Sequence, residues 1–243
     1  MQDCLESVRS WMHNNHLKLN ESKTEFLVIC GKTVQNKICN LSSITIGTES
    51  VEVSKVARNI GVLIDENLSM IDHVSSVSRA CYHQLHKISK IRQYLSEEAA
   101  SNLVRSLVLS KLDYCNSLLY GLPDYLLHRL QLVQNNAARL IFRKKKSDNV
   151  TPLLMQLHWL PVKQQILFKV NLLTLKSLNN LTPTYISELV QEYEPTHALH
   201  SSSMNFLAEK CAKLKRSGDR AYPICGPKLW NALPDSLRVP SVN

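Results

Sequence analysis

The sequence is poor in glycine and has no long uninterrupted apolar run. Only 6 of its 243 residues are glycine and 9 are proline, so few positions favour a break in the backbone. Long regular elements are therefore expected. No apolar segment approaches the roughly 20 residues that a membrane-spanning helix needs. The sequence predicts a folded protein without a membrane span.

The cysteines follow no disulfide or metal-binding pattern. Seven of them are spread along the chain and no two form a CxxC motif. Together with the lack of a signal-peptide pattern, this favours the cytoplasm or the nucleus, with most cysteines as small core residues. His197, His200, Cys211 and Cys225 are zinc-ligand types, but their spacing matches no common zinc motif.

No two aspartates are adjacent anywhere in the chain. Two-metal phosphoryl transfer requires carboxylates that converge within about 4 Å of both ions. We therefore interpret three separated acids as caps and ion-pair partners: Asp65, Asp72 and Asp113. Cys115 lies inside a helical apolar pattern, so it is interpreted as core rather than as a nucleophile with His128 or His158 as its base. No catalytic or metal-binding residue is predicted.

Positive charge is in excess. The 29 Lys and Arg residues outnumber the 20 acids, which gives a formal net charge of +9 and favours a polyanionic partner. A predicted helix over residues 126–140 leads into a basic cluster: Arg139, Arg143, Lys144, Lys145 and Lys146. A second basic stretch contains Lys210, Lys213, Lys215, Arg216 and Arg220. The first cluster is the main candidate for nucleic-acid binding. The alternative is a solvated helix end whose cations interact favourably with the negative end of the helix dipole.

Strand signals are confined to the first 68 residues. After a helix over residues 1–17, short apolar or alternating segments predict strands over 26–30, 43–46 and 51–53, and a further β segment over 59–65. This pattern predicts an α+β fold that is mostly α-helical, with a small antiparallel β region before a helical bundle.

Beyond residue 69 apolar residues recur at helical spacing. They predict helices over 74–91, 126–140 and 162–178, with Gly121 and Pro123 as a stop and a start before the second of these. Ser96 is expected to cap another helix. The predicted buried side of that helix contains Ala100, Leu103, Val104, Leu107, Tyr114 and Leu118. The tail over 197–243 is expected to wrap over the helices.

Several blocks, in order along the chain, carry a family resemblance. They are residues 11–20 with 23–25, then 59–65, 112–119, 130–141, 157–162 and 227–234. Together they resemble the segment that follows the catalytic aspartates in reverse transcriptases of non-LTR (LINE-type) retrotransposons, especially Jockey-like and chicken-repeat-like elements. At position 60 this family more often has Leu than the Ile found here.

The resemblance implies a right-hand polymerase fold. Residues 1–68 would be the end of the palm, 69–146 a thumb-like helical region that contacts the template-primer duplex, and 147–243 a C-terminal helical region and tail. Lys23 would lie near the incoming triphosphate. The primer-grip-like residues would be Asn59, Ile60, Gly61 and Val62.

One departure from the family decides the expected activity. The family's Asp-Asp pair belongs just before Cys4 and is not present, and neither are the fingers and the endonuclease. The Mg²⁺ ions of the full-length enzyme would have no platform, so this chain alone is expected to hold no cofactor and to be inactive. Its expected partners are RNA or an RNA–DNA hybrid, and the missing polymerase portion. The sequence predicts no oligomeric state. The alternative is a helical protein-interaction module without a nucleic-acid role.

Overall fold

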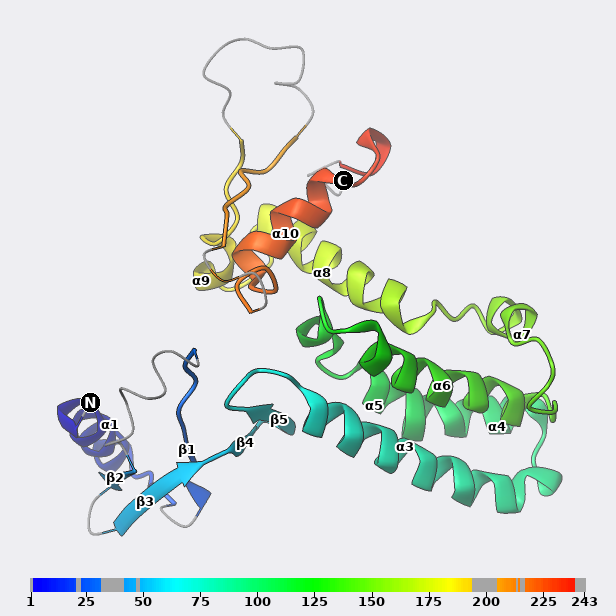
Figure 1. The fold of residues 1–243 in the computed structure, drawn as a ribbon, viewed down its shortest axis with the longest axis horizontal. Helices are drawn as coiled ribbons and strands as arrows, with labels where there is room; N and C mark the ends of the chain where they lie inside the picture. Colours follow the sequence, from blue (N-terminus) through cyan, green and yellow to red (C-terminus); the bar gives the residue numbers. More distant parts are fainter. Residues whose placement is uncertain are drawn as a thin grey trace. The chain divides into compact units, whose positions relative to one another are not determined.

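The computed structural model describes residues 2–20, 23–31, 42–46, 49–193, 205–212, 214 and 217–238. The chain forms two compact units, Met1–Ser75 and Ser76–Asn243. Every strand of the described residues belongs to the first unit, and the second is helical (Figure 1). The structure confirms the predicted fold class, a mostly helical α+β chain with a small β region.

The first unit contains helix α1 (Gln2–Asn14) and two small sheets. In the three-stranded sheet, β3 (Glu49–Ser54) lies between β2 (Ser43–Ile46) and β1 (Phe26–Leu27). The β2–β3 pair is antiparallel, as expected, whereas the β1–β3 pair is parallel. The second sheet is an antiparallel hairpin, described below. The strand predicted over 26–30 is shorter than expected, because only its first two residues pair.

The second unit contains most of α3 (Ile71–Ile91), followed by α4 (Glu97–Val104) and α5 (Ser110–Asp113). Ser96 caps α4 as predicted, since its Oγ accepts a hydrogen bond from the Ala99 N–H at 3.1 Å. A π-helical turn, Arg105–Leu109, joins α4 to α5.

The buried side predicted for this helix is wrong beyond Val104. Leu107, Tyr114 and Leu118 are 37%, 47% and 49% exposed. Beyond Val104 the buried residues are Val108 and Leu112, which continue the spacing of four from Ala100 and Val104. A π turn has more residues per turn than an α-helix, so it rotates the buried face away from the 3.6-residue pattern.

Helix α6 (Asp124–Ile141) starts after a turn at Gly121. Gly121 has a φ of +69°, and a Cβ added to it would lie 2.7 Å from Cγ of Arg220. Glycine is thus required for both backbone and space. The predicted buried stripe of α6 is confirmed for Leu126, Leu130, Val133 and Ala137.

The loop before α8 (Val162–Leu178) is fastened to α6 by two glutamines. The fully buried Gln134 donates from Nε2 to the Leu160 carbonyl oxygen at 2.9 Å. Gln131 Oε1 accepts from the Val162 N–H at 2.8 Å. The blocks over 130–141 and 157–162 are therefore joined by hydrogen bonds between side chains of the first and the main chain of the second, and α7 (Thr151–Gln156) lies between them in sequence.

A helix that the sequence did not predict, α10 (Tyr222–Asn231), packs on α8. Gly226 faces α8 closely enough that a Cβ there would lie 3.1 Å from Thr174 Oγ1. Trp230 is buried in a cluster with Val190 and Leu207. As expected, this part of the tail packs on the helices. A short helix, α9 (Thr184–Ser187), follows α8.

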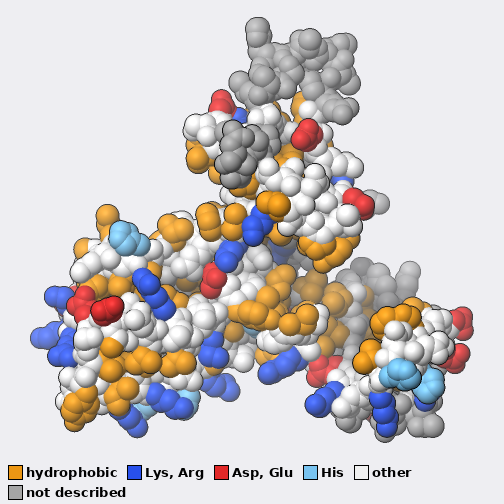
Figure 2. Space-filling model, turned by 180° about the vertical axis from the view of Figure 1, so that it is seen from behind, with side chains coloured by type: hydrophobic (Ala, Val, Ile, Leu, Met, Phe, Trp, Pro, Cys, Tyr) orange, Lys and Arg blue, Asp and Glu red, His pale blue; other side chains and the backbone are white. Residues whose placement is uncertain are grey.

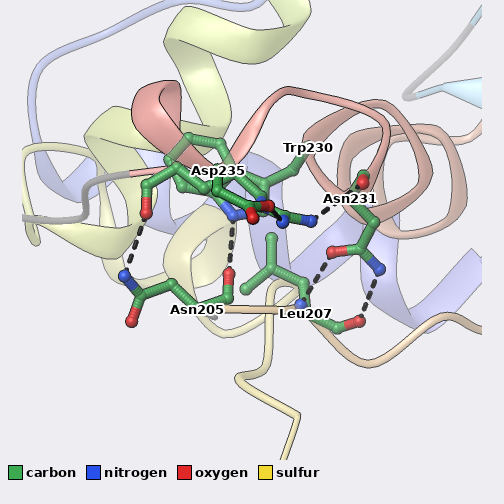
Figure 3. Close-up of polar contacts among 6 residues, drawn as sticks. Asn205, Leu207, Trp230, Asn231 and Asp235 are labelled. Carbon is green, nitrogen blue, oxygen red and sulfur yellow. Dashed lines mark hydrogen bonds and ion pairs between the residues drawn. The ribbon is translucent and has the colours of Figure 1, made fainter. Parts of the chain in front are cut away.

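The end of the described chain is closed by polar contacts (Figure 3). Trp230 Nε1 donates to the Asn205 carbonyl oxygen at 2.9 Å. The Asn231 side chain pairs with both the N–H and the carbonyl of Leu207, each at 2.9 Å. Arg238 is buried against Asp235 and lies 4.0 Å from the ring centroid of Phe206. Trp230 and Asn231, in the block over 227–234, therefore have a structural role.

Candidate nucleic-acid interface

A buried arginine joins the C-terminal ends of α3 and α6. Arg92, in the 3-10 turn Arg92–Tyr94 after α3, is only 7% exposed. Its guanidinium donates to the carbonyl oxygens of Leu95 at 2.7 Å, Leu140 at 3.0 Å and Ile141. The last two belong to the final turn of α6, whose carbonyls have no partner inside the helix. Burial, followed by the nearby charge of Arg143, lowers the pKa of the Arg92 guanidinium.

Arg143, just beyond α6, in turn contacts the chain that follows α3. Its backbone is left-handed, with a φ of 53°, and its side chain is exposed. Nη2 of Arg143 lies 3.1, 3.3 and 3.4 Å from the carbonyl oxygens of Arg92, Gln93 and Leu95. Each helix end therefore receives a guanidinium from the other, which complements the negative end of the helix dipole.

The other cations of the predicted basic cluster are of two kinds: those bonded to the main chain, called here tied, and those that are not. Arg139 is half-buried and donates from Nη2 to the Asp148 carbonyl oxygen at 3.1 Å. Lys144, Lys145 and Lys146, called here the lysine turn, are exposed. In the part of the chain that the structure describes, their ammonium groups form no ion pair. The lysine turn is thus the part of the cluster that is open to an anionic ligand.

The lysine turn belongs to a larger basic surface on α3 and α6. No acid occurs in the sequence between Asp72 and Glu97 or between Asp124 and Asp148, while these two stretches hold ten Lys and Arg residues. Because the whole chain has a net charge of +9, its remainder is close to neutral. The exposed faces of the two helices meet where Asn136 Nδ2 lies 3.2 Å from Tyr82 Oη.

Sequence reasoning missed the α3 side of this surface. Its exposed members are Arg79, Tyr82, His83, His86, Lys87 and Lys90. The lack of acids between Asp72 and Glu97 was the signal that could have found it. Figure 2 shows Lys and Arg side chains gathered at one end of the helical unit, with a few carboxylates among them. Glu97, Glu98 and Asp148 lie next to this surface in sequence.

The primer-grip-like residues form the turn of a hairpin in the first unit. The hairpin consists of β4 (Val56–Asn59) and β5 (Val62–Asp65), with Asn59 paired to Val62. Ile60 and Gly61 have φ values of 44° and 81°, the left-handed pair that a two-residue hairpin favours. Ile60 is 81% exposed. A β-branched residue rarely adopts a positive φ, so this exposed side chain occupies a strained position.

Lys23 is exposed and lies shortly before β1. Glu25, two residues later, accepts a hydrogen bond on Oε2 from the Arg58 N–H at 2.5 Å. The segment that carries Lys23 is therefore held beside β4. No contact of Lys23 with an anionic group is formed in the described part of the chain, and its position near a triphosphate stays a prediction.

Asp65 acts as an internal anchor for the loop before α3. Its carboxylate accepts hydrogen bonds from the N–H groups of Asn67 at 3.1 Å, Ser69 at 3.0 Å and Met70 at 2.7 Å, and from Ser69 Oγ at 3.1 Å. Burial acts to raise the pKa of Asp65, but these hydrogen bonds together hold it below its usual value. Nearby, buried His73 accepts the Leu63 N–H on Nδ1 at 3.4 Å, and burial lowers its pKa.

The other acids considered for metal binding are also accounted for. Asp113 forms an ion pair with Lys169 at 3.1 Å, and Asp72 lies exposed in the first turn of α3. The interpretation as surface caps and ion-pair partners is confirmed for Asp113, whereas Asp65 is a buried acceptor for the loop before α3. Within the described ranges, no three His, Cys, Asp or Glu side chains converge as a metal site would require. These acids do not fit the Mg²⁺ pair of polymerases, so we assign no catalytic step to them.

The cysteine prediction is wrong for most of the cysteines that can be placed. Cys81 and Cys225 are buried, Cys4 and Cys211 are exposed, and Cys30 and Cys115 are half-buried. Burial raises the pKa of the Cys225 thiol to about 11, which disfavours a thiolate ligand. Two of the four residues of the zinc alternative, His197 and His200, lie outside the described residues.

Cys115 is not inside a helix, contrary to expectation. It has a left-handed φ of 53° after α5. His128 and His158, its possible bases, are both exposed.

The second basic stretch is only partly described. Arg220 is tied to the protein, since Nε donates to the Tyr120 carbonyl oxygen at 3.0 Å and Nη2 to that of Leu118 at 3.1 Å. Lys210 is exposed. Three members lie outside the described residues: Lys213, Lys215 and Arg216. Among the described residues, this stretch therefore has one exposed lysine, Lys210, which is not assigned to the basic surface on α3 and α6.

Comparisons with known proteins do not add to this geometry. No family model matches the chain, and neither does a curated protein or a solved structure. Among the described helices, none is both long and apolar enough to cross a bilayer.

Proposed function

We propose that this chain is the C-terminal part of a non-LTR retrotransposon reverse transcriptase and that it holds RNA or an RNA–DNA hybrid. The observation that carries the proposal is the lysine turn at the joined ends of α3 and α6, which lies within one of the two stretches without acids. Exposed cations on such a surface gain free energy by displacing the counterions of a phosphate backbone. The binding is of the kind that positions a strand without reading its sequence.

The arginine contacts support this role by fixing the base of the lysine turn. Arg92 and Arg143 use their guanidinium groups on main-chain carbonyls, and Arg139 holds the Asp148 carbonyl. The ends of the turn are therefore held, so less chain entropy is lost on binding than for a free tail. The three lysines remain available for phosphates.

The proposed activity does not include synthesis by this chain alone. Its 243 residues contain no adjacent Asp pair, and the described acids are used in hydrogen bonds and ion pairs or stand apart. Mg²⁺ chemistry would belong to the missing polymerase portion, which is the protein partner that the proposal implies. The cytoplasm or the nucleus, where RNA and its hybrids occur, is the proposed location.

The test is binding of a fluorescently labelled RNA–DNA hybrid, measured by anisotropy over a range of salt concentrations. In the variant K144A/K145A/K146A, the slope of log K against log salt should fall by about three, and affinity at low salt should fall on the order of 10- to 100-fold. The matched control is K176A/K210A/K228A, which removes the same charge from exposed lysines of the same unit. Equal losses in the two variants would contradict the assignment of the interface.

A second candidate function is a helical protein-interaction module. It is favoured by large apolar side chains that are exposed in the second unit, among them Tyr125, Met155 and Phe168. Where such groups form a contiguous patch, they are typical of a surface that contacts another protein. Hybrid binding that is absent, or that is unchanged in K144A/K145A/K146A, would favour this function over the first.

A further inference from the structure

Ser147 follows four consecutive cations, Arg143, Lys144, Lys145 and Lys146. It occupies the third position of a β-turn in which the Asp148 N–H donates to the Lys145 carbonyl oxygen at 3.1 Å. The same turn is closed a second time, because the Lys145 N–H donates to Asp148 Oδ2 at 2.9 Å. The Ser147 side chain is exposed, and its hydroxyl has no hydrogen-bond partner among the described residues.

We propose that Ser147 is a phosphorylation site for a Ser/Thr kinase that recognises basic residues on the N-terminal side of its target. We further infer that the phosphate switches off nucleic-acid binding at the lysine turn, an inference that rests on the function proposed above. Ser147 Oγ would attack the γ-phosphorus of ATP, the bond from that phosphorus to the β,γ-bridging oxygen would break, and ADP would leave. The hydroxyl proton passes to a carboxylate base of the kinase.

The local structure makes Ser147 a better target than other serines with basic neighbours. A kinase binds its target segment in an extended form, and Ser147 lies outside the described helices, in an exposed turn closed by two hydrogen bonds between Lys145 and Asp148. Ser89, by contrast, lies within α3 and donates from Oγ to the His86 carbonyl oxygen at 2.8 Å. Ser217 also follows basic residues, but it is half-buried.

The charge of the phosphate explains the expected switch. A phosphoserine adds roughly −1.5 to −2 at pH 7 and offers three acceptor oxygens to the adjacent lysines. It would therefore offset nearly half of the charge of the four consecutive cations at 143–146 and repel the backbone of a nucleic acid. The salt slope of binding should fall by about two, with a loss of affinity on the order of tenfold at low salt.

The experiment treats the full chain with a purified Ser/Thr kinase that prefers basic targets, in the presence of Mg²⁺ and ATP. Peptide mass spectrometry locates the phosphate in wild type, S147A and S217A. The phosphorylated and unmodified proteins are then compared for hybrid binding by anisotropy. We expect the phosphate on Ser147 in wild type and S217A, no phosphate at this turn in S147A, and weaker binding only after phosphorylation. Unmodified S147A should bind like wild type.

Two results would overturn the proposed switch while leaving the proposed function intact. One is phosphate on Ser217 but not on Ser147. The other is phosphorylation of Ser147 that leaves a salt-dependent affinity for the hybrid unchanged. A different result would overturn the proposed function on which the switch rests. If the unmodified chain fails to bind the hybrid at all, the proposed function fails and the switch fails with it, whatever the mass spectra show.

Discussion

The two ends of α3 are held by opposite charges. At its start, the Asp65 carboxylate collects the N–H groups of Asn67, Ser69 and Met70. At its end, the guanidinium of Arg143 meets the carbonyl oxygens of Arg92, Gln93 and Leu95. An anion near the N-terminal end and a cation near the C-terminal end both complement the helix dipole. The anion is buried, whereas this cation is exposed.

This difference in burial separates charges with a structural role from charges that remain available to bind a ligand. Buried Asp65 and buried Arg92 each have several hydrogen-bond partners on the main chain, so the fold depends on them. Arg143 is intermediate, because it caps a helix end and yet faces solvent. The lysine turn has charge without such partners. Substitution of the buried Asp65 or Arg92 should therefore mainly reduce stability, and substitution of the lysine turn should mainly reduce binding.

The largest effect is expected for Arg92→Met, which keeps most of the aliphatic side chain but removes the guanidinium. The carbonyl oxygens of Leu95, Leu140 and Ile141 would lose their shared donor in a buried position. The free energy of unfolding should fall by about 3 kcal/mol, since buried groups left without partners cost about 1–3 kcal/mol each and some will find water. Urea denaturation followed by circular dichroism measures the change.

Arg143→Ala sharpens the same comparison. Its hydrogen bonds are longer and its side chain is exposed, so the expected loss is about 1 kcal/mol. If Arg143→Ala costs as much as Arg92→Met, then exposure does not separate the two arginines and the series proposed here is wrong.

A loss of about 2 kcal/mol, between those of Arg92→Met and Arg143→Ala, is expected at the other end of α3 for Asp65→Asn. The amide lacks the charge and turns an NH₂ group toward N–H donors. The folded pKa of Asp65 is lowered, so its contribution to stability is present above its unfolded pKa of about 3.9 and is lost as pH falls through the folded value. His73, whose pKa is also lowered, adds a loss that begins as pH falls below about 6.5.

Urea denaturation at a series of pH values distinguishes these two contributions. Asp65→Asn should remove the decline below about pH 4 and keep the one that begins near pH 6.5. A variant whose stability still falls like wild type below pH 4 would show that Asp65 is not the anchor of this loop.

Periodicity was enough to predict elements whose apolar pattern is local. The bounds of α8 and of β2, and the Ser96 cap, appear in the structure as predicted. The buried face beyond Val104 was not predictable, because a π turn changes the period and the local apolar pattern does not indicate it. Helix α10 was missed because it contains Pro223, Gly226 and Pro227, which disfavour a helix locally, while packing on α8 stabilises it.

For the candidate interface, the sequence predicted which residues are cationic but not which of them are tied. Arg139, Arg143 and Arg220 looked equivalent to the neighbouring lysines in composition. The structure distinguishes them because each reaches a main-chain carbonyl that is distant in sequence from its own position or lies in the next loop. Arg92 was not singled out at all, since a buried arginine at a helix end has no pattern of its own. Long-range hydrogen bonds of this kind are determined by the packing of helices, not by spacing.

The smallest effect on stability is expected for K144A/K145A/K146A, the variant with the largest expected loss of hybrid binding. Exposed side chains without ion-pair partners contribute little, so the free energy of unfolding should stay within about 0.5 kcal/mol of wild type. Removing three like charges from one turn also relieves repulsion, so a slight gain in the free energy of unfolding would agree with the distinction between tied and available cations. The same urea denaturation experiment provides the measurement, with K176A/K210A/K228A as the control. A loss above 1 kcal/mol would mean that the lysines, like Arg92, are part of the fold, and the distinction between tied and available cations would no longer hold.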